Sequence, residues 1–432
     1  MHIRRKKAFR ELVRTLRAIE ADPEDLGLVR ELNLGVLKQV LQAEQAVVRH
    51  RATERDLKGR LRAGRQDKSE SSALKTRLKR VRTYISGLQD QIFVWKCFGD
   101  SLAHVYLDKF AIKQAYFDTD RQGAKETAGM MFGKEGLPYE MGLMFDAIEH
   151  GVPAILCDIT NVLRYGDVCL LGESDPVLLE VKSGGRLNQR GKRQAAKLAK
   201  LHSFLETDQA EGLRGRRGPV RRVTVDVPER SNVAALNECI AQAKADGDCI
   251  TQPERGVIYA AFYGKPNLDS FTAAIGPDPA LVYMLNIDKN DHAWAPYVPF
   301  TMSIRAEDSL LDFIEGRLFL FVVIKPEILC DMMQRDDWMV RYRPGVEYPI
   351  QFLHPATKAY FGVSGEFIAR AAYEFISLSW MAEANAPSIE KLKGVTDDFI
   401  GPPDPEEHRR RIIANMGSDD EWAQLLLDAA PL

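Results

Sequence analysis

Apolar spacing in the first third of the chain predicts two long helices. The first runs from about Asn33 to Leu61, with apolar side chains on or near one face. The second begins after a polar break at residues 64–72, where Ser72 is a candidate N-cap. Its apolar residues keep the four-three spacing of a heptad seam, apart from Gly99: Leu74, Leu78, Val81, Ile85, Leu88, Ile92, Trp95 and Leu102. A helical hairpin or coiled coil is therefore predicted.

Shorter helices alternate with strands from Leu137 onward. Apolar residues at four-three-four spacing place a helix between Leu137 and Gly151, and apolar or alternating segments after it predict strands. The later elements are strands at 154–159, 166–171 and 176–183, a helix at 188–205 and a strand at 221–227. This α-β-β-β-α-β order predicts an α/β core with a central mixed sheet.

The last 200 residues predict an α+β region without a recognisable chemical motif. Its expected elements are helices at 232–245 and 366–382 and strands near 257–263, 281–287 and 318–324. The predicted regions of the whole chain are a basic helical region at 1–125, a core at 126–230, an α+β region at 231–400 and an acidic C-terminal tail at 401–432.

Composition indicates a globular cytoplasmic protein. Hydrophobic residues make up 45% of the 432 residues and charged residues 28%, and no run of 18 apolar residues occurs. A membrane span is therefore not expected, and the basic N-terminus lacks the apolar stretch of a secretory signal. The six cysteines show no CxxC or Cys/His spacing, so we expect reduced thiols rather than disulfides or a zinc finger.

The net charge of -2 conceals strong segregation along the sequence. Residues 1–125 contain 27 Lys and Arg against 16 Asp and Glu, and residues 183–230 contain 12 against 5. Basic regions of this size indicate a polyanionic partner, although solvated helix faces are an alternative for the first one. No GxxxxGK[ST] loop is present, so ATP-driven movement would need another subunit.

Candidate chemistry lies in the segment GDVCLLGESDPVLLEVKSG. If residues 172–175 form a hairpin loop, Asp167 lies opposite Glu180, with Cβ atoms about 5 Å apart. Two facing carboxylates repel each other unless a cation lies between them, and a divalent metal is the natural occupant. Lys182 falls on the same face as Glu180 because strand side chains alternate. Such a site suits phosphodiester hydrolysis, in which hard oxygen ligands hold Mg²⁺ and a lysine offsets developing charge.

A further acid is expected from the helix that begins at Leu137. Glu140 borders its apolar stripe and is placed to face the sheet edge where the metal would bind, with Glu135 as the alternative.

The segment at about residues 135–230 resembles the PD-(D/E)xK nuclease superfamily, the restriction-endonuclease-like fold of many restriction enzymes, junction resolvases and recombination nucleases. Gly166 stands where this family usually has a proline. The resemblance implies a Mg²⁺ site, with Mn²⁺ as a possible substitute. The residues it implies are Asp167, Glu180 and the main-chain carbonyl of Val181 as metal ligands, Lys182 as the catalytic lysine and Glu140 as a supporting acid.

The predicted helix at 188–205 carries a basic stripe beside its apolar face. The stripe repeats at three-four-three spacing and comprises Arg190, Arg193, Lys197 and Lys200. These side chains are candidates for contacts to successive phosphates, and Gln194 lies where the family often has a glutamine. The alternative is a solvated helix surface, with Gln194 as a simple cap-region residue.

We therefore expect a metal-dependent nuclease, with DNA favoured over RNA and endonuclease over exonuclease action. Analogy alone extends this to a phage-defence or restriction-like effector. The alternatives are a catalytically silent nucleic-acid-binding protein that keeps the fold, and a coiled-coil scaffold. The heptad seam predicts a homodimer, and the alternative is a monomer whose helical hairpin packs on the core. A separate regulatory subunit is a further possible partner.

Overall fold

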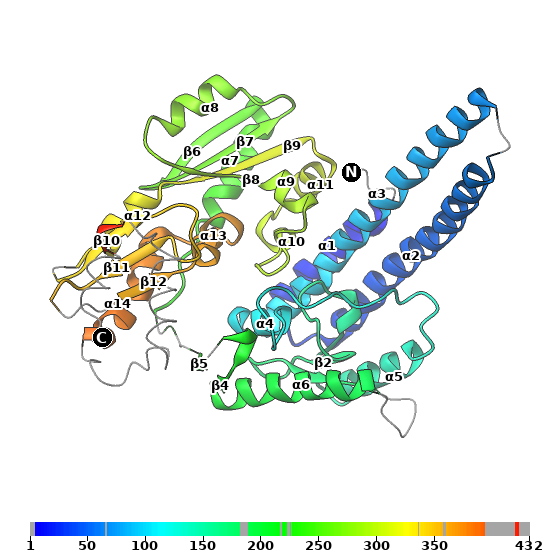
Figure 1. Cartoon of the computed structure of the whole chain (residues 1–432), viewed down its shortest axis with the longest axis horizontal. Helices are drawn as coiled ribbons and strands as arrows, with labels where there is room; N and C mark the ends of the chain where they lie inside the picture. Colours follow the sequence, from blue (N-terminus) through cyan, green and yellow to red (C-terminus); the bar gives the residue numbers. More distant parts are fainter. Residues whose placement is uncertain are drawn as a thin grey trace. The chain divides into compact units, whose positions relative to one another are not determined.

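A computed structural model describes residues 5–64, 67–181, 189–216, 218–222, 225, 227–335, 337–356, 360–393 and 420–422. The fold is mixed α and β, with an N-terminal helical region and several small antiparallel sheets (Figure 1). The chain forms two compact units. Unit 1 comprises residues 1–215 and 289–316, and unit 2 comprises residues 216–288 and 317–432.

Three helices open unit 1: α1 (Lys6–Ala21), α2 (Leu26–Ala63) and α3 (Lys68–Tyr106). Helices α2 and α3 pair side by side, so the predicted helical hairpin is confirmed (Figure 1). Helix α2 ends at Gly64, which has a φ of 64° that favours glycine. The prediction of Ser72 as N-cap is wrong, because the Asp67 carboxylate already accepts a hydrogen bond from the Glu70 amide at 2.8 Å.

The heptad seam of α3 is largely covered within the chain. Ile85 and Leu88 form a buried cluster with Val47 of α2. Leu74, Trp95 and Leu102 are also buried. The interruption at Gly99 has a physical reason, since a Cβ there would lie 2.3 Å from the carbonyl oxygen of Ile159. Helix α3 therefore approaches the backbone of the core directly at this point.

The core of unit 1 follows the predicted order through its first strands. Its elements are α4 (Lys109–Tyr116), α5 (Leu137–Glu149), β1 (Ala154–Leu156), the 3-10 helix η1 (Cys157–Ile159), β2 (Val168–Leu170), β3 (Val177–Leu179) and α6 (Gln189–Thr207). The strands form an antiparallel sheet in the order β1-β2-β3. The predicted register is confirmed, because Cys169 pairs with Leu178.

Two details of the predicted core differ in the structure. The first strand ends early, because the Thr160 hydroxyl and amide both donate to the Cys157 carbonyl and close a 3-10 turn. The expected strand at 221–227 is seen only as β5 (Pro219–Arg221), which pairs with β4 (Gln209–Glu211) in a separate two-stranded sheet. The four-stranded mixed sheet is thus not seen among the described residues, which omit 223, 224 and 226.

Unit 2 contains two antiparallel sheets. The first has the order β6-β7-β9-β8 and the second β10-β11-β12. The strands are β6 (Asp248–Glu254), β7 (Val257–Tyr263), β8 (Leu281–Met284), β9 (Leu318–Ile324), β10 (Met339–Tyr342), β11 (Ile350–Leu353) and β12 (Tyr360–Val363). The helices are α7 (Val233–Asp246), α8 (Leu268–Ile275), α12 (Pro326–Met333), α13 (Gly365–Tyr373) and α14 (Leu378–Lys393).

Predictions for this region held for elements with strong apolar patterns. The strands predicted at 257–263 and 318–324 are confirmed. The strand at 281–287 stops early because Asn286 turns into α9 (Leu285–Asn290) and bonds the backbone of β9 at Leu318 and Leu320. The single helix at 366–382 is wrong: Phe375, with a φ of 56°, separates α13 from α14.

Residues 289–316 return to unit 1 and contain α10 (Phe300–Ser303) and α11 (Glu307–Glu315). Arg17 of α1 donates to the Thr301 carbonyl at 2.7 Å, and the Thr301 hydroxyl lies 2.7 Å from that of Ser101 on α3. Lys6 pairs with Glu315 at 3.0 Å. This segment is therefore an integral part of the helical region.

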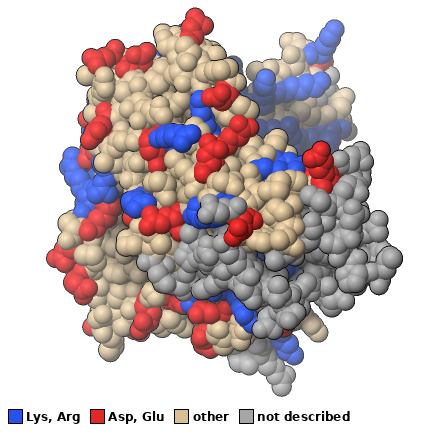
Figure 2. All heavy atoms as spheres, turned by 90° about the vertical axis from the view of Figure 1, so that its left-hand side faces the viewer, with Lys and Arg blue, Asp and Glu red and all other residues tan. Residues whose placement is uncertain are grey.

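Charged side chains are dispersed over the face drawn in Figure 2. Figure 2 shows Asp and Glu side chains scattered over the visible face, with Lys and Arg side chains among them. All six cysteines are buried free thiols. Within the described ranges, no helix combines the length and apolar character that crossing a bilayer requires.

Candidate functional site

Asp167 is held in place by the end of strand β3. Its amide donates to the Leu179 carbonyl at 2.7 Å, and its carboxylate accepts from the Val181 amide at 2.9 Å. The preceding Gly166 has a φ of 70°, and a Cβ there would lie 2.8 Å from the Leu179 carbonyl oxygen. Glycine is therefore required where the nuclease family usually has proline.

Three carboxylates meet at the ammonium group of Lys134. The Nζ atom lies 2.9 Å from Glu140, 2.8 Å from Asp158 and 3.2 Å from Asp167. These acids come from the first turn of α5, from η1 and from the start of β2, and we call them the carboxylate cluster. Glu140 is 2% exposed and Asp158 6%. The predicted position of Glu140 next to Asp167 agrees with this geometry.

The cluster is electrostatically coupled to Lys134. Burial raises the pKa of Glu140, and the nearby charge of Asp167 adds to this, while the hydrogen bond from Lys134 opposes it. Burial by itself lowers the pKa of Lys134, but hydrogen bonds to Asp158 and Glu140 outweigh it and raise the pKa well above its ordinary value. Lys134 therefore stays charged and compensates the three acids.

Further ionisable groups from the helical hairpin surround Asp158. Burial lowers the pKa of Lys96 on α3, whereas the charges of Asp158, Glu44 and Asp100 oppose that shift. Glu44 on α2 accepts a hydrogen bond from the Phe132 amide at 2.8 Å. The hairpin is therefore joined to the core by buried charge as well as by apolar packing.

The three carboxylates are the kind of ligand that a hard divalent cation prefers, but their present spacing does not fit such a cation. Carboxylate oxygens are the ligands that Mg²⁺ and Mn²⁺ prefer. Across the described ranges, however, no group of three or more His, Cys, Asp or Glu side chains is arranged to hold a metal ion. The distances of 2.8 to 3.2 Å around Lys134 fit an ammonium, and Mg²⁺ needs about 2.1 Å. Metal binding would require Lys134 to withdraw and the acids to close in.

Other residues of the predicted site have fewer described contacts at the cluster or lie outside the described residues. Glu180 is half-buried, and its charge opposes the lowering of the Lys125 pKa that burial causes. Val181 contacts the site through its amide, which donates a hydrogen bond to the Asp167 carboxylate, whereas the prediction used its carbonyl as a metal ligand. Lys182 lies outside the described residues. Its predicted role is therefore untested.

The basic stripe of α6 is partly neutralised within unit 1. Lys197 contacts both carboxylate oxygens of Asp118 at 2.8 and 2.9 Å, and Lys200 lies 3.6 Å from Asp120. Two of the four predicted phosphate contacts are thus already paired with acids. Arg193 is exposed and Gln194 half-buried, whereas the Arg190 side chain lies outside the described residues.

Sequence reasoning missed Lys134 and Asp158. Asp158 is the one charged residue in the apolar segment AILCDI, which was a usable signal, since a carboxylate inside a buried strand needs a partner. Lys134 had no such signal, because its role depends on how the chain before α5 folds back over the sheet. Comparisons with family models, curated proteins and solved structures found no match for this chain.

Proposed function

We propose that unit 1 is a metal-dependent nuclease that hydrolyses phosphodiester bonds, with DNA as the favoured substrate. The observation that supports this is the convergence of Glu140, Asp158 and Asp167 on one point beside the end of β3. The resemblance of the Asp167, Glu180 and Lys182 spacing to the PD-(D/E)xK superfamily supports it separately.

The three acids would hold the cation, with the Val181 amide fixing the orientation of Asp167. A bound Mg²⁺ supplies polarisation of a phosphate oxygen and a lower pKa for water. Lys134 offsets part of the negative charge of the acids in the absence of a metal and, once displaced, would offer its charge to a phosphate next to them. Lys182 follows directly after Val181 and would be a second cation for the same task.

The alternative is a catalytically silent protein that binds nucleic acid. Its support is the same ion-pair cluster, in which Lys134 would stay bound to the three acids permanently as a structural element.

Cleavage of circular DNA separates these two functions. We expect the purified chain to nick or linearise circles in Mg²⁺ or Mn²⁺ and to leave them intact in EDTA. Asp167→Asn should lower the rate by about a hundredfold or more. Glu173→Gln, an exposed carboxylate in the β2–β3 turn, is the matched control. No cleavage of circular DNA, linear DNA or RNA with either metal would favour the silent protein.

A further inference from the structure

The far half of the helical hairpin carries a concentrated positive charge. Residues 49–84 contain 13 Lys and Arg against 4 Asp and Glu, a net charge of +9. We call the described part of this segment, residues 49–64 and 67–84, the basic arm. Figure 1 shows this end of α2 and α3 extending beyond the other elements of unit 1. It is therefore open to a large partner.

Few of these cations are neutralised within the chain. Glu54 pairs with Lys58 and Arg82, and Glu70 pairs with Arg60. Nine further exposed Lys and Arg side chains have no ion pair with a described residue: Arg49, Arg51, Arg55, Arg62, Lys68, Lys75, Arg77, Lys79 and Arg80. This distinguishes the arm from the α6 stripe, where Lys197 and Lys200 face Asp118 and Asp120.

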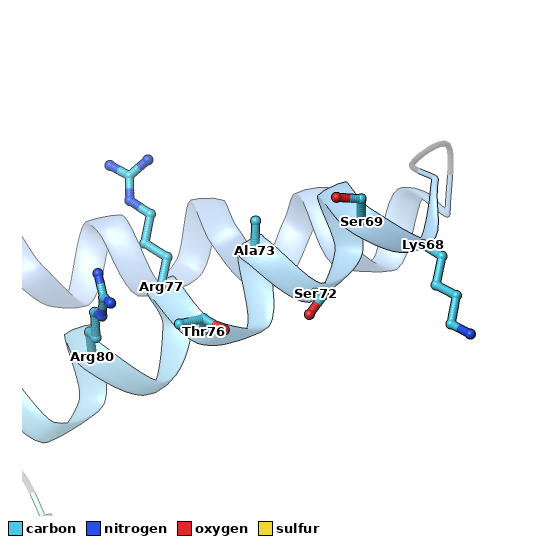
Figure 3. Close-up of a pocket in the computed structure, with 7 residues that line it drawn as sticks. All are labelled: Lys68, Ser69, Ser72, Ala73, Thr76, Arg77 and Arg80. Carbon is cyan, nitrogen blue, oxygen red and sulfur yellow. The ribbon is translucent and has the colours of Figure 1, made fainter.

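Two shallow depressions follow one side of α3 along the arm. The first has a volume of about 960 Å³, and its lining includes Ser72, Thr76, Lys68, Arg77 and Arg80. Figure 3 shows Lys68 and Arg77 pointing outward from the helix in different directions. The second, of about 500 Å³, shares Thr76 and Arg80 with the first. The two depressions are therefore continuous, and cationic side chains and hydroxyl donors line them. From Lys68 to Arg80 this lining extends about 18 Å along the helix axis.

From these observations we infer that the basic arm binds the phosphate backbone of double-stranded nucleic acid. Duplex DNA carries roughly ten charges over about 18 Å, so a helix segment of this length with several exposed cations can meet several phosphates at once. Ser and Thr hydroxyls are suitable donors to phosphate oxygens. Among the described arm residues no large apolar side chain is exposed, whereas a helix that lies on a membrane needs an apolar face.

The choice of nucleic acid as partner rests on the proposed nuclease function, but the arm itself is tested by binding alone. The full chain is titrated with a labelled DNA duplex in EDTA between about 50 and 200 mM salt. The test variant combines Arg77→Gln, Lys79→Gln and Arg80→Gln. The control combines Lys38→Gln, Lys244→Gln and Lys265→Gln, which are equally exposed and lie outside the arm.

The arm variant should bind at least about tenfold more weakly and lower the log-log salt slope by up to about 2.7, that is 0.9 for each lost contact. The control should stay within about twofold of the natural chain. Equal affinity and slope in the arm variant would overturn the inference. So would binding of phosphatidylserine vesicles that needs the three cations while duplex binding does not. If duplex binding depends on the arm but no cleavage occurs in Mg²⁺, the arm inference is supported and the nuclease proposal is refuted. If cleavage occurs but duplex binding does not depend on the arm, the nuclease proposal is supported and the arm inference is refuted.

Discussion

Lys134 is the residue on which the site depends in the absence of a metal. Its Nζ atom contacts three acids, two of which are almost completely buried. Removing one partner of a buried charge group leaves the others uncompensated, which costs more than the interaction itself contributes. A divalent cation should replace the missing positive charge.

Replacing Lys134 by glutamine tests this directly. We expect Lys134→Gln to lower the free energy of unfolding by about 3 kcal/mol in EDTA. Mg²⁺ or Mn²⁺ should then raise the thermal midpoint of the variant more than that of the natural chain, as scanning calorimetry would measure. Lys38→Gln is the control, because Lys38 is exposed on α2. A variant indifferent to both metals would argue against a cation site at the carboxylate cluster.

Asp100 on α3 should give the protein a particular pH dependence. Burial raises its pKa from 3.8 to about 7, although hydrogen bonds from Asn161 and the Val162 amide oppose the shift. Between these values the folded chain keeps a proton that the unfolded chain has lost. This contribution to stability is complete below about pH 4 and is lost as the pH rises through about 7, by up to about 1.4 kcal/mol per pH unit.

Denaturant unfolding at several pH values would measure this slope. Asp100→Asn does not titrate, so the difference between the two proteins isolates the Asp100 contribution. Parallel curves for the natural chain and Asp100→Asn would show that Asp100 ionises normally in the folded state.

At the scale of elements, Gly99 sets how closely α3 approaches η1. Alanine normally stabilises a helix relative to glycine by about 1 kcal/mol. At Gly99 the added Cβ would lie 2.3 Å from the Ile159 carbonyl oxygen, and backbone would have to move. At Gly87 of the same helix nothing lies within 4 Å of the added atom.

The two glycines therefore predict opposite signs. Gly99→Ala should lower the free energy of unfolding by about 1 to 3 kcal/mol, and Gly87→Ala should raise it by about 0.5 to 1 kcal/mol. Urea unfolding measures both. Because η1 carries Asp158, Gly99→Ala should also lower the proposed nuclease activity. Equal stability of the two variants would contradict the close approach.

Elements with a sustained apolar period were predictable from the sequence, and short ones were not. The hairpin, α5, α6, β7 and β9 repeat their apolar spacing over at least two turns or seven residues, so local pattern determined them. Strands β10 to β12 have four residues each, too few to show a period. In the site, Asp167 followed from hairpin register, whereas Lys134 and Asp158 meet it only through tertiary folding that no local spacing encodes.

For the whole molecule, the homodimer is still a prediction, but the heptad seam of α3 no longer supports it. The sequence suggested a dimer because the seam of α3 needed a partner, and α2 of the same chain largely covers that seam. A dimer interface would therefore have to use other surfaces. Light scattering on the intact chain should give twice 48.6 kDa if the dimer forms. A mass near 48.6 kDa at micromolar concentration would refute it.

The return of residues 289–316 to unit 1 affects how the protein is made. The surfaces of α1 and α3 that Thr301 and Glu315 cover stay open until the ribosome has translated unit 2 as far as Asp288 and then this segment. Strand β9, which lies between β7 and β8, begins only two residues after Gly316. Unit 1 is therefore complete once Gly316 has been translated, whereas unit 2 still lacks its second segment at that point. A nascent chain that stops before Gly316 contains neither unit whole, so termination before that residue would not release an intact unit 1 into the cell.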